Sequence, residues 1–354
     1  MVFDLFVFDL NLGFLSCHQN PTLEEPIMQA IILTSHGDAG VLQLQEMPRP
    51  EVRPGHLLIR MAATSVNQID IKIRQGLPIG PELPSSIGCD LAGVVEAVGE
   101  GVSGFAPGDE VYGCATGVKG VGGSLAEYVV ADARLVAPKP RSLSMREAAA
   151  LPLVGITAWD AMARSGVSQG EHVLVHGGAG GVGHVAIQLA KARGARVATT
   201  VLSQESADFA RALGADDVIR ADQEEVADYV QRLTGGAGFD MVFDTVGGAN
   251  LDRAFQAACL EGRVAATAAR STHDLSPLHA KALSLYVVFM LIPMLHNRQR
   301  ERHGRILREL AGLVDAGRLR PCLDAAHFSL AQAGDAHRRL ESGSVLGKVV
   351  IDIA

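Results

Sequence analysis

The sequence predicts an α/β protein of two parts, one rich in β-strands and one built on a parallel sheet covered by helices. The first observation is the run from Met28 to about Val136, where short apolar stretches alternate with glycine and proline, as in a barrel or sandwich. The second is the region from Glu171 onward, where strand-like and helix-like segments alternate and therefore predict βα units. The third is a glycine-rich stretch at 177–183, which lies between the first strand and the first helix of that region.

In the β-rich part, apolar alternation predicts a series of short strands. Leu57, Ile59 and Met61 alternate with other residues along one of them, as a half-buried strand requires. Glycine and proline mark the junctions, for example at 53–55 and 106–109. We expect strands at 29–33, 41–44, 56–65, 91–98 and 125–130.

The apolar pattern changes from a strand period to a helix period near Ser144. Ser144 and Glu147 have the spacing of a capping box, so a helix should begin there. Pro152 should separate this helix from a second one through 157–163. Beyond it we expect strands at 172–176, 196–201, 216–219, 239–244 and 262–268, with helices at 181–193, 204–213, 223–233 and 249–260. The apolar segment 283–294 is a further strand candidate, followed by helices at 301–316 and 329–340 and a last strand at 347–353.

Composition limits the function classes. A chain of 354 residues with 48% hydrophobic and 20% charged residues fits a globular protein of two domains. The net charge of −8 argues against a nucleic-acid surface, so we expect no nucleic-acid partner. The five cysteines are scattered and form no C-x-x-C pair, which predicts neither a disulfide framework nor a zinc knuckle and favours a reducing, cytoplasmic compartment.

Residues 1–27 form an N-terminal extension outside the regular pattern. The segment contains no lysine or arginine, and Asp4 and Asp9 interrupt its apolar run, so it does not resemble a signal peptide. A start-site artefact and an arm that packs on a neighbour are both compatible with it. The longest apolar run elsewhere, 283–295, contains Ser284 and Pro293 and is too short to cross a bilayer, so we expect no membrane association.

The glycine-rich stretch matches G-x-G-x-x-G at Gly178, Gly180 and Gly183, directly after a short apolar strand and before a helical pattern. The first glycine allows a tight turn, the second lets a pyrophosphate approach the backbone, and the third lets the helix pack on the strand. Phosphates would then lie at the helix N-terminus. This context predicts a dinucleotide site, with Ala179, Gly181 and Val182 completing the cradle.

The end of the second strand of this region indicates which dinucleotide binds. NAD sites place an acid there on the ribose hydroxyls. No acid follows Val201, so a 2′-phosphate would not be repelled, and Ser203 or Gln204 would hydrogen-bond it. No basic residue follows directly. We therefore favour NADPH over NADH.

Three sets of residues resemble the medium-chain dehydrogenases/reductases, in the zinc-independent quinone oxidoreductase branch that includes zeta-crystallin. They are Gly88–Val95 with Gly99, Val102 and Gly108–Val111, then Gly170–Lys191, and finally Asn67–Asp70 with Arg74 and Gly76. The resemblance extends from Met28 to Ile353. It implies a GroES-like catalytic domain formed by 28–150 and 297–354, and a Rossmann NAD(P)-binding domain at 151–296.

The resemblance also implies that no metal is bound. The places where the zinc dehydrogenases of the family ligate a catalytic zinc hold Asn67, Cys89 and Leu153, and these side chains cannot form a tetrahedral zinc site. Of the cysteines of the structural zinc lobe, only Cys114 lies nearby. Without a Lewis acid, simple alcohol oxidation is disfavoured. We therefore expect hydride transfer from NADPH to a quinone or an α,β-unsaturated carbonyl.

The family places suggest catalytic residues, each with a structural alternative. Asn67 would donate to the substrate carbonyl, or it is a turn residue that bonds its own backbone. Asp70 would form an i,i+4 ion pair with Arg74 and help to shape the site. Tyr112 would be a proton donor, although a buried tyrosine with a satisfied hydroxyl is commoner.

Further residues are implied to lie at the cofactor. Thr157 matches a family position near the nicotinamide. Val246 and Gly247 should flank a ribose, and Ala268 should approach the nicotinamide. Lys348, in the family's G-K pair, often lies near the cofactor; the alternative is a solvated charge before the last strand.

The resemblance also implies a homodimer, in which the apolar edge segment 283–295 pairs across a two-fold axis. An exposed apolar edge would otherwise favour aggregation. Two other functions remain open: an enoyl-thioester reductase, and a non-catalytic NADPH-binding protein like a crystallin. The partner expected for the leading function is a small quinone or enone.

Overall fold

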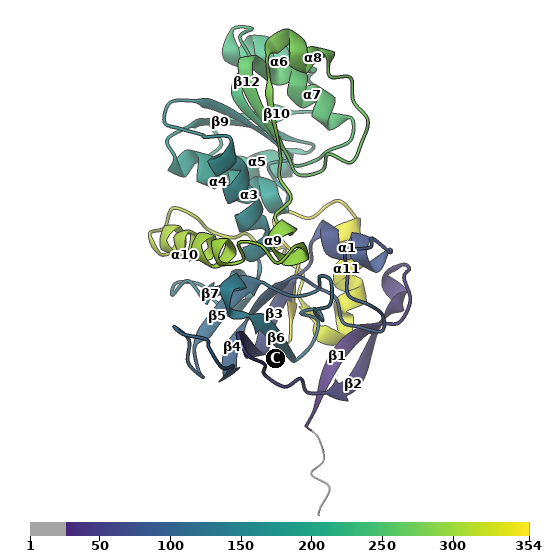
Figure 1. Cartoon of the computed structure of the whole chain (residues 1–354). Helices are drawn as coiled ribbons and strands as arrows, with labels where there is room; N and C mark the ends of the chain where they lie inside the picture. Colours follow the sequence, from purple (N-terminus) through teal and green to yellow (C-terminus); the bar gives the residue numbers. More distant parts are fainter. Residues whose placement is uncertain (1–25, 354) are drawn as a thin grey trace, which may run out of the picture.

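The computed structural model of the chain describes residues 26–353. The predicted extension at 1–27 therefore lies almost wholly outside the described residues. Figure 1 shows two parts, with the parallel sheet and its helices above and the β-rich part below. Both chain ends contribute to the lower part, because the last strand pairs with a strand from the first hundred residues. The predicted α/β class is confirmed.

The β-rich part is a seven-stranded sheet beside a two-stranded antiparallel ribbon. The ribbon consists of β1 (Ile27–Leu33) and β2 (Leu42–Pro48). The larger sheet has the order β14-β15-β3-β4-β5-β7, with β6 paired to β3. Its strands are β3 (His56–Ser65), β4 (Asp90–Val98), β5 (Glu110–Cys114), β6 (Tyr128–Asp132), β7 (Val136–Pro138), β14 (Phe328–Ser329) and β15 (Val350–Asp352).

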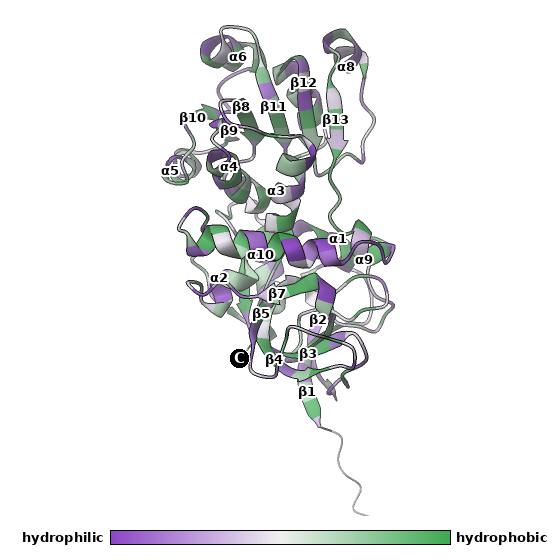
Figure 2. Cartoon of the chain, turned by 60° about the vertical axis from the view of Figure 1, so that its left-hand side comes forward, coloured by the Kyte–Doolittle hydropathy of each residue, from purple (hydrophilic) through white to green (hydrophobic). Residues whose placement is uncertain are grey.

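The upper sheet is parallel throughout, in the order β10-β9-β8-β11-β12-β13. Its strands are β8 (His172–His176), β9 (Arg196–Val201), β10 (Asp217–Arg220), β11 (Phe239–Asp244), β12 (Ala258–Ala266) and β13 (Ser284–Val287). Val173 and Val175 pack into one hydrophobic cluster while Leu174 packs into another. Successive side chains of a strand point to opposite faces, so this sheet is buried on both sides. Figure 2 accordingly shows the central strands β8 and β11 largely green between the helices, whereas the edge strand β13 is paler.

Helices cover the two faces. α4 (Gly181–Ala192) and α5 (Gln204–Ala212) lie on one side, and α6 (Val226–Thr234), α7 (Asn250–Ala257) and α8 (Ser276–Lys281) on the other. α1 (Gln68–Arg74), α9 (Ile292–Leu295) and α11 (Ala333–Glu341) lie nearer the β-rich part. α10 (Glu301–Asp315) packs against β7 and against α3 (Pro152–Arg164). No helix among residues 26–353 is long and apolar enough to span a membrane.

The predicted capping box is present at the start of α2 (Met145–Ala149). The Ser144 N–H donates to Glu147 Oε2 at 2.8 Å, and the Glu147 N–H donates to Ser144 Oγ at 3.3 Å. α3 (Pro152–Arg164) begins at Pro152, whose missing N–H is no loss in the first turn of a helix.

Two element predictions are corrected. The helix expected at 249–260 ends at Ala257, because β12 begins at the next residue. The strand expected over 283–294 is only β13, and α9 follows it. Pro293 explains the change, since its fixed φ and missing N–H suit the first turn of a helix and not a paired strand.

Candidate functional site

The glycine turn after β8 is closely packed at Gly178 and Gly183 and open at Gly180. A Cβ on Gly178 would lie 2.0 Å from Thr199 Oγ1, and one on Gly183 would lie 2.1 Å from the Gly177 carbonyl oxygen. Glycine is therefore needed at both positions for close packing. At Gly180 the nearest atom would be 3.4 Å away, so this position faces open space. Within the described chain, the N–H groups of residues 181–183 have no acceptor, which leaves them available to a phosphate.

The edge of the sheet beside the turn carries a serine and an arginine. Ser203 follows β9 and caps α5, accepting from the Ser206 N–H at 3.1 Å and donating to Ser206 Oγ at 2.9 Å. Arg220 is the last residue of β10 and pairs in register with Val201. The sequence search for a basic residue directly after Val201 missed it, because it lies on the neighbouring strand. The shared C-terminal edge of the two strands is the signal that would have found it.

The loop after β11 is held by the buried carboxylate of Asp244. This carboxylate accepts from the N–H groups of Val246 at 3.0 Å and Gly247 at 3.1 Å, and from Asn250 Nδ2 at 2.8 Å. Gly247 has φ of 79° and lies against Ala268, whose carbonyl oxygen would be 2.6 Å from a Cβ there. Val246, Gly247 and Ala268 therefore lie together at the C-terminal edge of the sheet.

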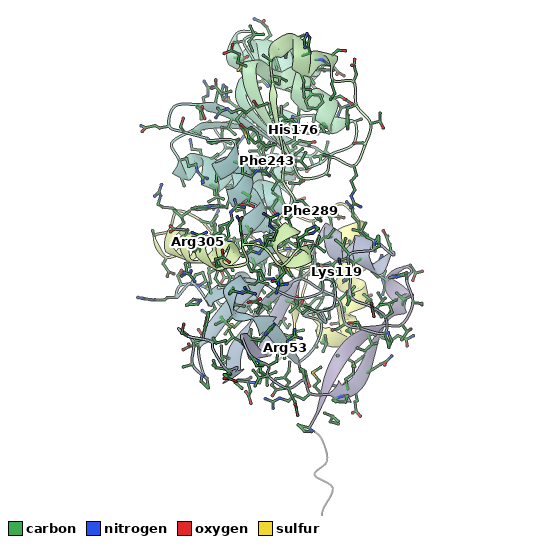
Figure 3. The ribbon with its side chains drawn as sticks, in the orientation of Figure 1. Arg53, Lys119, His176, Phe243, Phe289 and Arg305 are labelled. Atoms are coloured by element: carbon green, nitrogen blue, oxygen red, sulfur yellow. The ribbon has the colours of Figure 1, made fainter. Side chains whose placement is uncertain are left out.

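His176 ends β8 and is buried behind this loop, in the part of the molecule formed by the parallel sheet (Figure 3). Its Nδ1 lies 2.6 Å from Asn250 Nδ2. Burial lowers the pKa of its imidazole to about 4. The ring is thus neutral in ordinary conditions and accepts from Asn250.

Asn67, Asp90 and Lys348 form a buried polar cluster where the two parts meet. Asn67 Nδ2 donates to Asp90 Oδ2 at 2.8 Å. Lys348 Nζ donates to Asn67 Oδ1 and, at 3.0 Å, to the Val66 carbonyl, and it lies 3.5 Å from Asp90 Oδ2. The remaining carboxylate contacts come from Ser65 Oγ at 2.7 Å and the Leu153 N–H at 2.8 Å.

The partners fix the orientation of the Asn67 amide. A lysine ammonium can only donate and a carboxylate can only accept, so Oδ1 must face Lys348 and Nδ2 must face Asp90. Asn67 Nδ2 carries two hydrogens, and Asp90 takes one of them. The second N–H is available, and the ammonium on Oδ1 polarises the amide and strengthens that donor.

Lys348 was expected at the cofactor, but its ammonium belongs to this cluster. Its stem passes beneath the glycine turn, where a Cβ on Gly181 would lie 3.2 Å from Lys348 Cδ. The N–H of the preceding Gly347 donates to the Ala179 carbonyl at 2.9 Å. Gly347 and Lys348 therefore connect the glycine turn to the Asn67 cluster. Burial lowers the pKa of the ammonium, while Asp90 opposes that shift.

The expected Asp70–Arg74 ion pair is wrong. Asp70 Oδ2 accepts from the Asn67 N–H at 2.8 Å at the start of α1, whereas Arg74 points to α11 and binds Glu341 Oε1 at 2.5 Å. Among residues 26–353, Asp70 Oδ1 has no hydrogen-bond partner. Burial raises the pKa of this carboxyl to about 6; the Asp90 charge acts in the same direction and the adjacent Cys89 thiol in the opposite one.

Tyr112 lies away from the cluster. Its buried hydroxyl donates to the Leu307 carbonyl of α10 at 2.5 Å, and burial raises the pKa of the phenol. The proton-donor role is withdrawn, because this hydroxyl ties β5 to α10. Thr157 lies one turn after Leu153 on α3, and its hydroxyl donates to the Leu153 carbonyl at 2.7 Å.

The residues at the family's catalytic-metal places do not fit zinc. Within residues 26–353, no group of three His, Cys, Asp or Glu side chains is arranged to hold a metal. The amide of Asn67 directs its N–H₂ end at Asp90, and the Lys348 ammonium already neutralises that carboxylate. A divalent cation placed there would be repelled by Lys348.

Comparisons with known proteins identify the family of the chain. Residues 53–141 match the family model for the alcohol dehydrogenase GroES-like domain, and residues 213–351 match that for a zinc-binding dehydrogenase. The chain belongs to the medium-chain dehydrogenase/reductase superfamily. Within it, the similarity lies with the zinc-independent quinone oxidoreductase branch.

Three curated relatives each align with 92% of the chain. A 2-methylene-furan-3-one reductase of Solanum lycopersicum is 34% identical, with 79% of its length covered. An NADPH-dependent alkenal/one oxidoreductase of Arabidopsis thaliana is 32% identical, also with 79% covered. The human quinone oxidoreductase is 29% identical, with 98% covered.

Solved structures are similar over the same extent. An alcohol dehydrogenase superfamily protein from Novosphingobium aromaticivorans is 41% identical with a TM-score of 0.88, covering 92% of this chain and 100% of that one. A mycobacterial protein solved in complex with NADPH is 33% identical with a TM-score of 0.83 and the same coverage.

Proposed function

We propose that the protein is an NADPH-dependent oxidoreductase that reduces a quinone or an α,β-unsaturated carbonyl without zinc. The observation that carries the proposal is the Lys348–Asn67–Asp90 cluster, which presents an amide donor at the family's metal place. The names of the relatives support the acceptor class. An acceptor of this class is already electrophilic and needs only a donor to its developing oxyanion.

NADPH supplies the hydride when bound. The free N–H of Asn67 donates to the acceptor oxygen as negative charge develops on it, and Lys348 strengthens that donor through Oδ1. Asp90 holds the amide in this orientation. The Tyr112 hydroxyl is engaged by the Leu307 carbonyl, and we propose that solvent protonates the reduced acceptor.

The phosphate-bearing cofactor is favoured at the edge formed by β9 and β10. No acid follows Val201, and Arg220 lies beside that residue in register. An arginine at this edge is a suitable partner for a 2′-phosphate. Arg220 binds Asp222 at 2.8–2.9 Å, and we propose that it turns from this exposed carboxylate to the phosphate. Ser203, Gly178–Gly183, Val246, Gly247, Ala268 and Thr157 complete the proposed cofactor site.

The assembly and compartment are part of the proposal. β13 is an edge strand with exposed Leu285 and Val287, and Ile292 follows on α9. These apolar groups support a homodimer through 283–295. Leu285→Glu should give a monomer in light scattering, and an unchanged mass would exclude this interface.

We further propose that one domain consists of 28–150 and 297–354, and the other of 151–296. The free thiols of Cys89, Cys114, Cys259 and Cys322 support a cytoplasmic location.

The test is to follow NADPH and NADH oxidation with a panel of quinones, enones and a short enoyl-thioester, with and without a chelator. Turnover of quinones or enones that survives chelation supports the proposal. Loss of turnover on chelation would overturn zinc independence. Turnover of the thioester alone would identify an enoyl reductase, and tight NADPH binding without turnover would identify a binding protein.

A further inference from the structure

A hydrogen-bonded chain of three side chains lies outside the proposed catalytic cluster. His273 Nδ1 lies 2.8 Å from Asp252 Oδ1 in the first turn of α7, and His273 Nε2 lies 2.5 Å from Ser271 Oγ. Asp252 can only accept, so Nδ1 carries a hydrogen, and Nε2 lies within hydrogen-bond distance of the Ser271 hydroxyl. The Phe255 ring packs edge-on to the imidazole with centroids 6.2 Å apart. The ring is therefore fixed from two sides.

The connectivity is that of a hydrolase triad, but the surroundings do not suit catalysis. Ser271 lies exposed on a loop. A catalytic nucleophile works from a concave site that holds the substrate against it, and an exposed loop residue does not have this setting. We therefore interpret these hydrogen bonds as contacts that hold the loop of Ser271 and His273 in place.

What it holds is the loop 267–275, which connects β12 to α8. The Thr267 N–H donates to the Asp244 carbonyl at 3.1 Å, at the start of the loop. Beyond that point, the N–H groups of residues 268–275 have no acceptor within the described part of the chain. Among the described residues, the His273–Asp252 bond is the one hydrogen bond that ties 268–275 to α7. The bonds from Ser276 to Asp274 and from the His279 N–H to the Leu275 carbonyl only join the end of the loop to α8, the next element of the chain. Besides it, Ala269 packs on the neighbouring hydrophobic cluster.

The same loop carries Ala268, which lies against Gly247. We propose that His273 is a positioning residue that clasps loop 267–275 to α7 and thereby determines how tightly NADPH is retained. This inference rests on the proposed function, which places Ala268 and Gly247 at the cofactor. Releasing the clasp lets Ala268 leave Gly247, so part of the binding free energy is spent on ordering the loop.

Release of loop 267–275 can be measured without an activity assay, because Arg270 provides a cleavage site for trypsin within the loop. Arg270 is exposed in the middle of the loop, so trypsin should cut after it when the loop is released. We expect His273→Ala and Asp252→Ala to speed this cut by about tenfold or more, with the fragment identified by mass and the site confirmed by Arg270→Gln. NADPH should slow the cut in the full-length protein. An unchanged cutting rate in both variants would overturn the clasp.

Measurements of NADPH binding and turnover distinguish the release of loop 267–275 from a general loss of stability. For His273→Ala we expect the NADPH Kd to rise by about fivefold to tenfold, with kcat at saturating NADPH and the acceptor KM within about twofold of wild type. Asp252→Asn, unlike Asp252→Ala, should keep the wild-type cutting rate and NADPH Kd, since its amide oxygen still accepts from His273 Nδ1. His279→Ala, which changes an exposed histidine of α8, is the matched control. Equal Kd values for wild type and His273→Ala, or failure of Asp252→Asn to rescue, would contradict the proposal. If the proposed reductase activity itself is wrong, the effect of the clasp on cutting at Arg270 will persist.

Discussion

Lys348 donates a hydrogen bond to the side-chain oxygen of Asn67, although the two lie 281 positions apart in the chain. The contact brings a cation from the last strand region to the amide before α1. It connects the glycine turn to the Asn67 amide, because the neighbouring Gly347 is bonded to Ala179. The orientation and polarity of the Asn67 amide donor therefore depend on a lysine from a distant part of the sequence.

Lys348→Met should lower kcat far more than it changes the NADPH KM. The methionine keeps the stem but removes the ammonium that polarises Asn67, and we expect a fall of about tenfold to a hundredfold. It also leaves the buried Asp90 without its cation, which should cost about 3 kcal/mol in the free energy of unfolding. Steady-state kinetics and urea unfolding check the two effects. Lys191→Met, which removes a half-buried lysine bonded to Asp216, is the control, and equal kcat values for both variants would refute the role of Lys348.

Asn67→Ala should reduce kcat by a similar factor, and combining it with Lys348→Met should not add a second full loss. Residues that act as one unit are non-additive, because the lysine has no amide left to polarise. The double-mutant cycle in kcat measures this coupling. Independent, multiplicative losses would show that Lys348 acts by another route.

Ser203→Asp should shift the cofactor preference from NADPH toward NADH. Aspartate is an equally good N-cap, so α5 keeps its first turn, while the new charge repels a 2′-phosphate. Arg220→Gln should lower kcat/KM for NADPH by about tenfold and leave NADH little changed. Arg211→Gln, an exposed arginine of α5 paired with Asp208, is the matched control. Parallel losses with both cofactors would exclude Arg220 as the phosphate residue.

These predictions depend unequally on what the sequence alone contains. The glycine turn, and the succession of strands and helices along the chain from Glu171 onward, follow from local periodicity, since each segment has its own apolar pattern. The partners of charged side chains do not. Arg74 has an acid four residues away on its own helix, yet it binds Glu341, because α11 packs beside α1 in the fold. Arg220 is similarly defined by its neighbour on the adjoining strand, and Lys348 by side chains from a distant segment, and no local pattern reveals either.

The buried carboxyl of Asp70 should make stability depend on pH. Its pKa is raised from 3.8 to about 6, so the folded state binds this proton more tightly than the unfolded state does. Its ionised form therefore destabilises the fold fully above about pH 6, and this penalty disappears as the pH falls toward the unfolded value. A shift of this size corresponds to about 3 kcal/mol.

Asp70→Asn isolates this contribution, because an amide oxygen still accepts from the Asn67 N–H. We expect its free energy of unfolding, relative to wild type, to rise by up to about 3 kcal/mol between about pH 4 and about pH 7. Urea unfolding at the two pH values is the measurement. A difference that does not change with pH would mean that Asp70 keeps its ordinary pKa.

Two glycines of the turn should respond in opposite ways to alanine. A Cβ on Gly183 meets the backbone carbonyl of Gly177 at 2.1 Å, so Gly183→Ala should force α4 from β8 and destabilise the protein by about 2 kcal/mol or more. A Cβ on Gly180 meets nothing closer than 3.4 Å, so Gly180→Ala should keep the wild-type melting temperature. The added methyl group nevertheless occupies the space that a pyrophosphate needs, and the NADPH Kd should rise by about tenfold or more. Thermal unfolding and cofactor titration of the two variants separate packing from binding. Unchanged affinity in Gly180→Ala would mean that the pyrophosphate does not approach this turn.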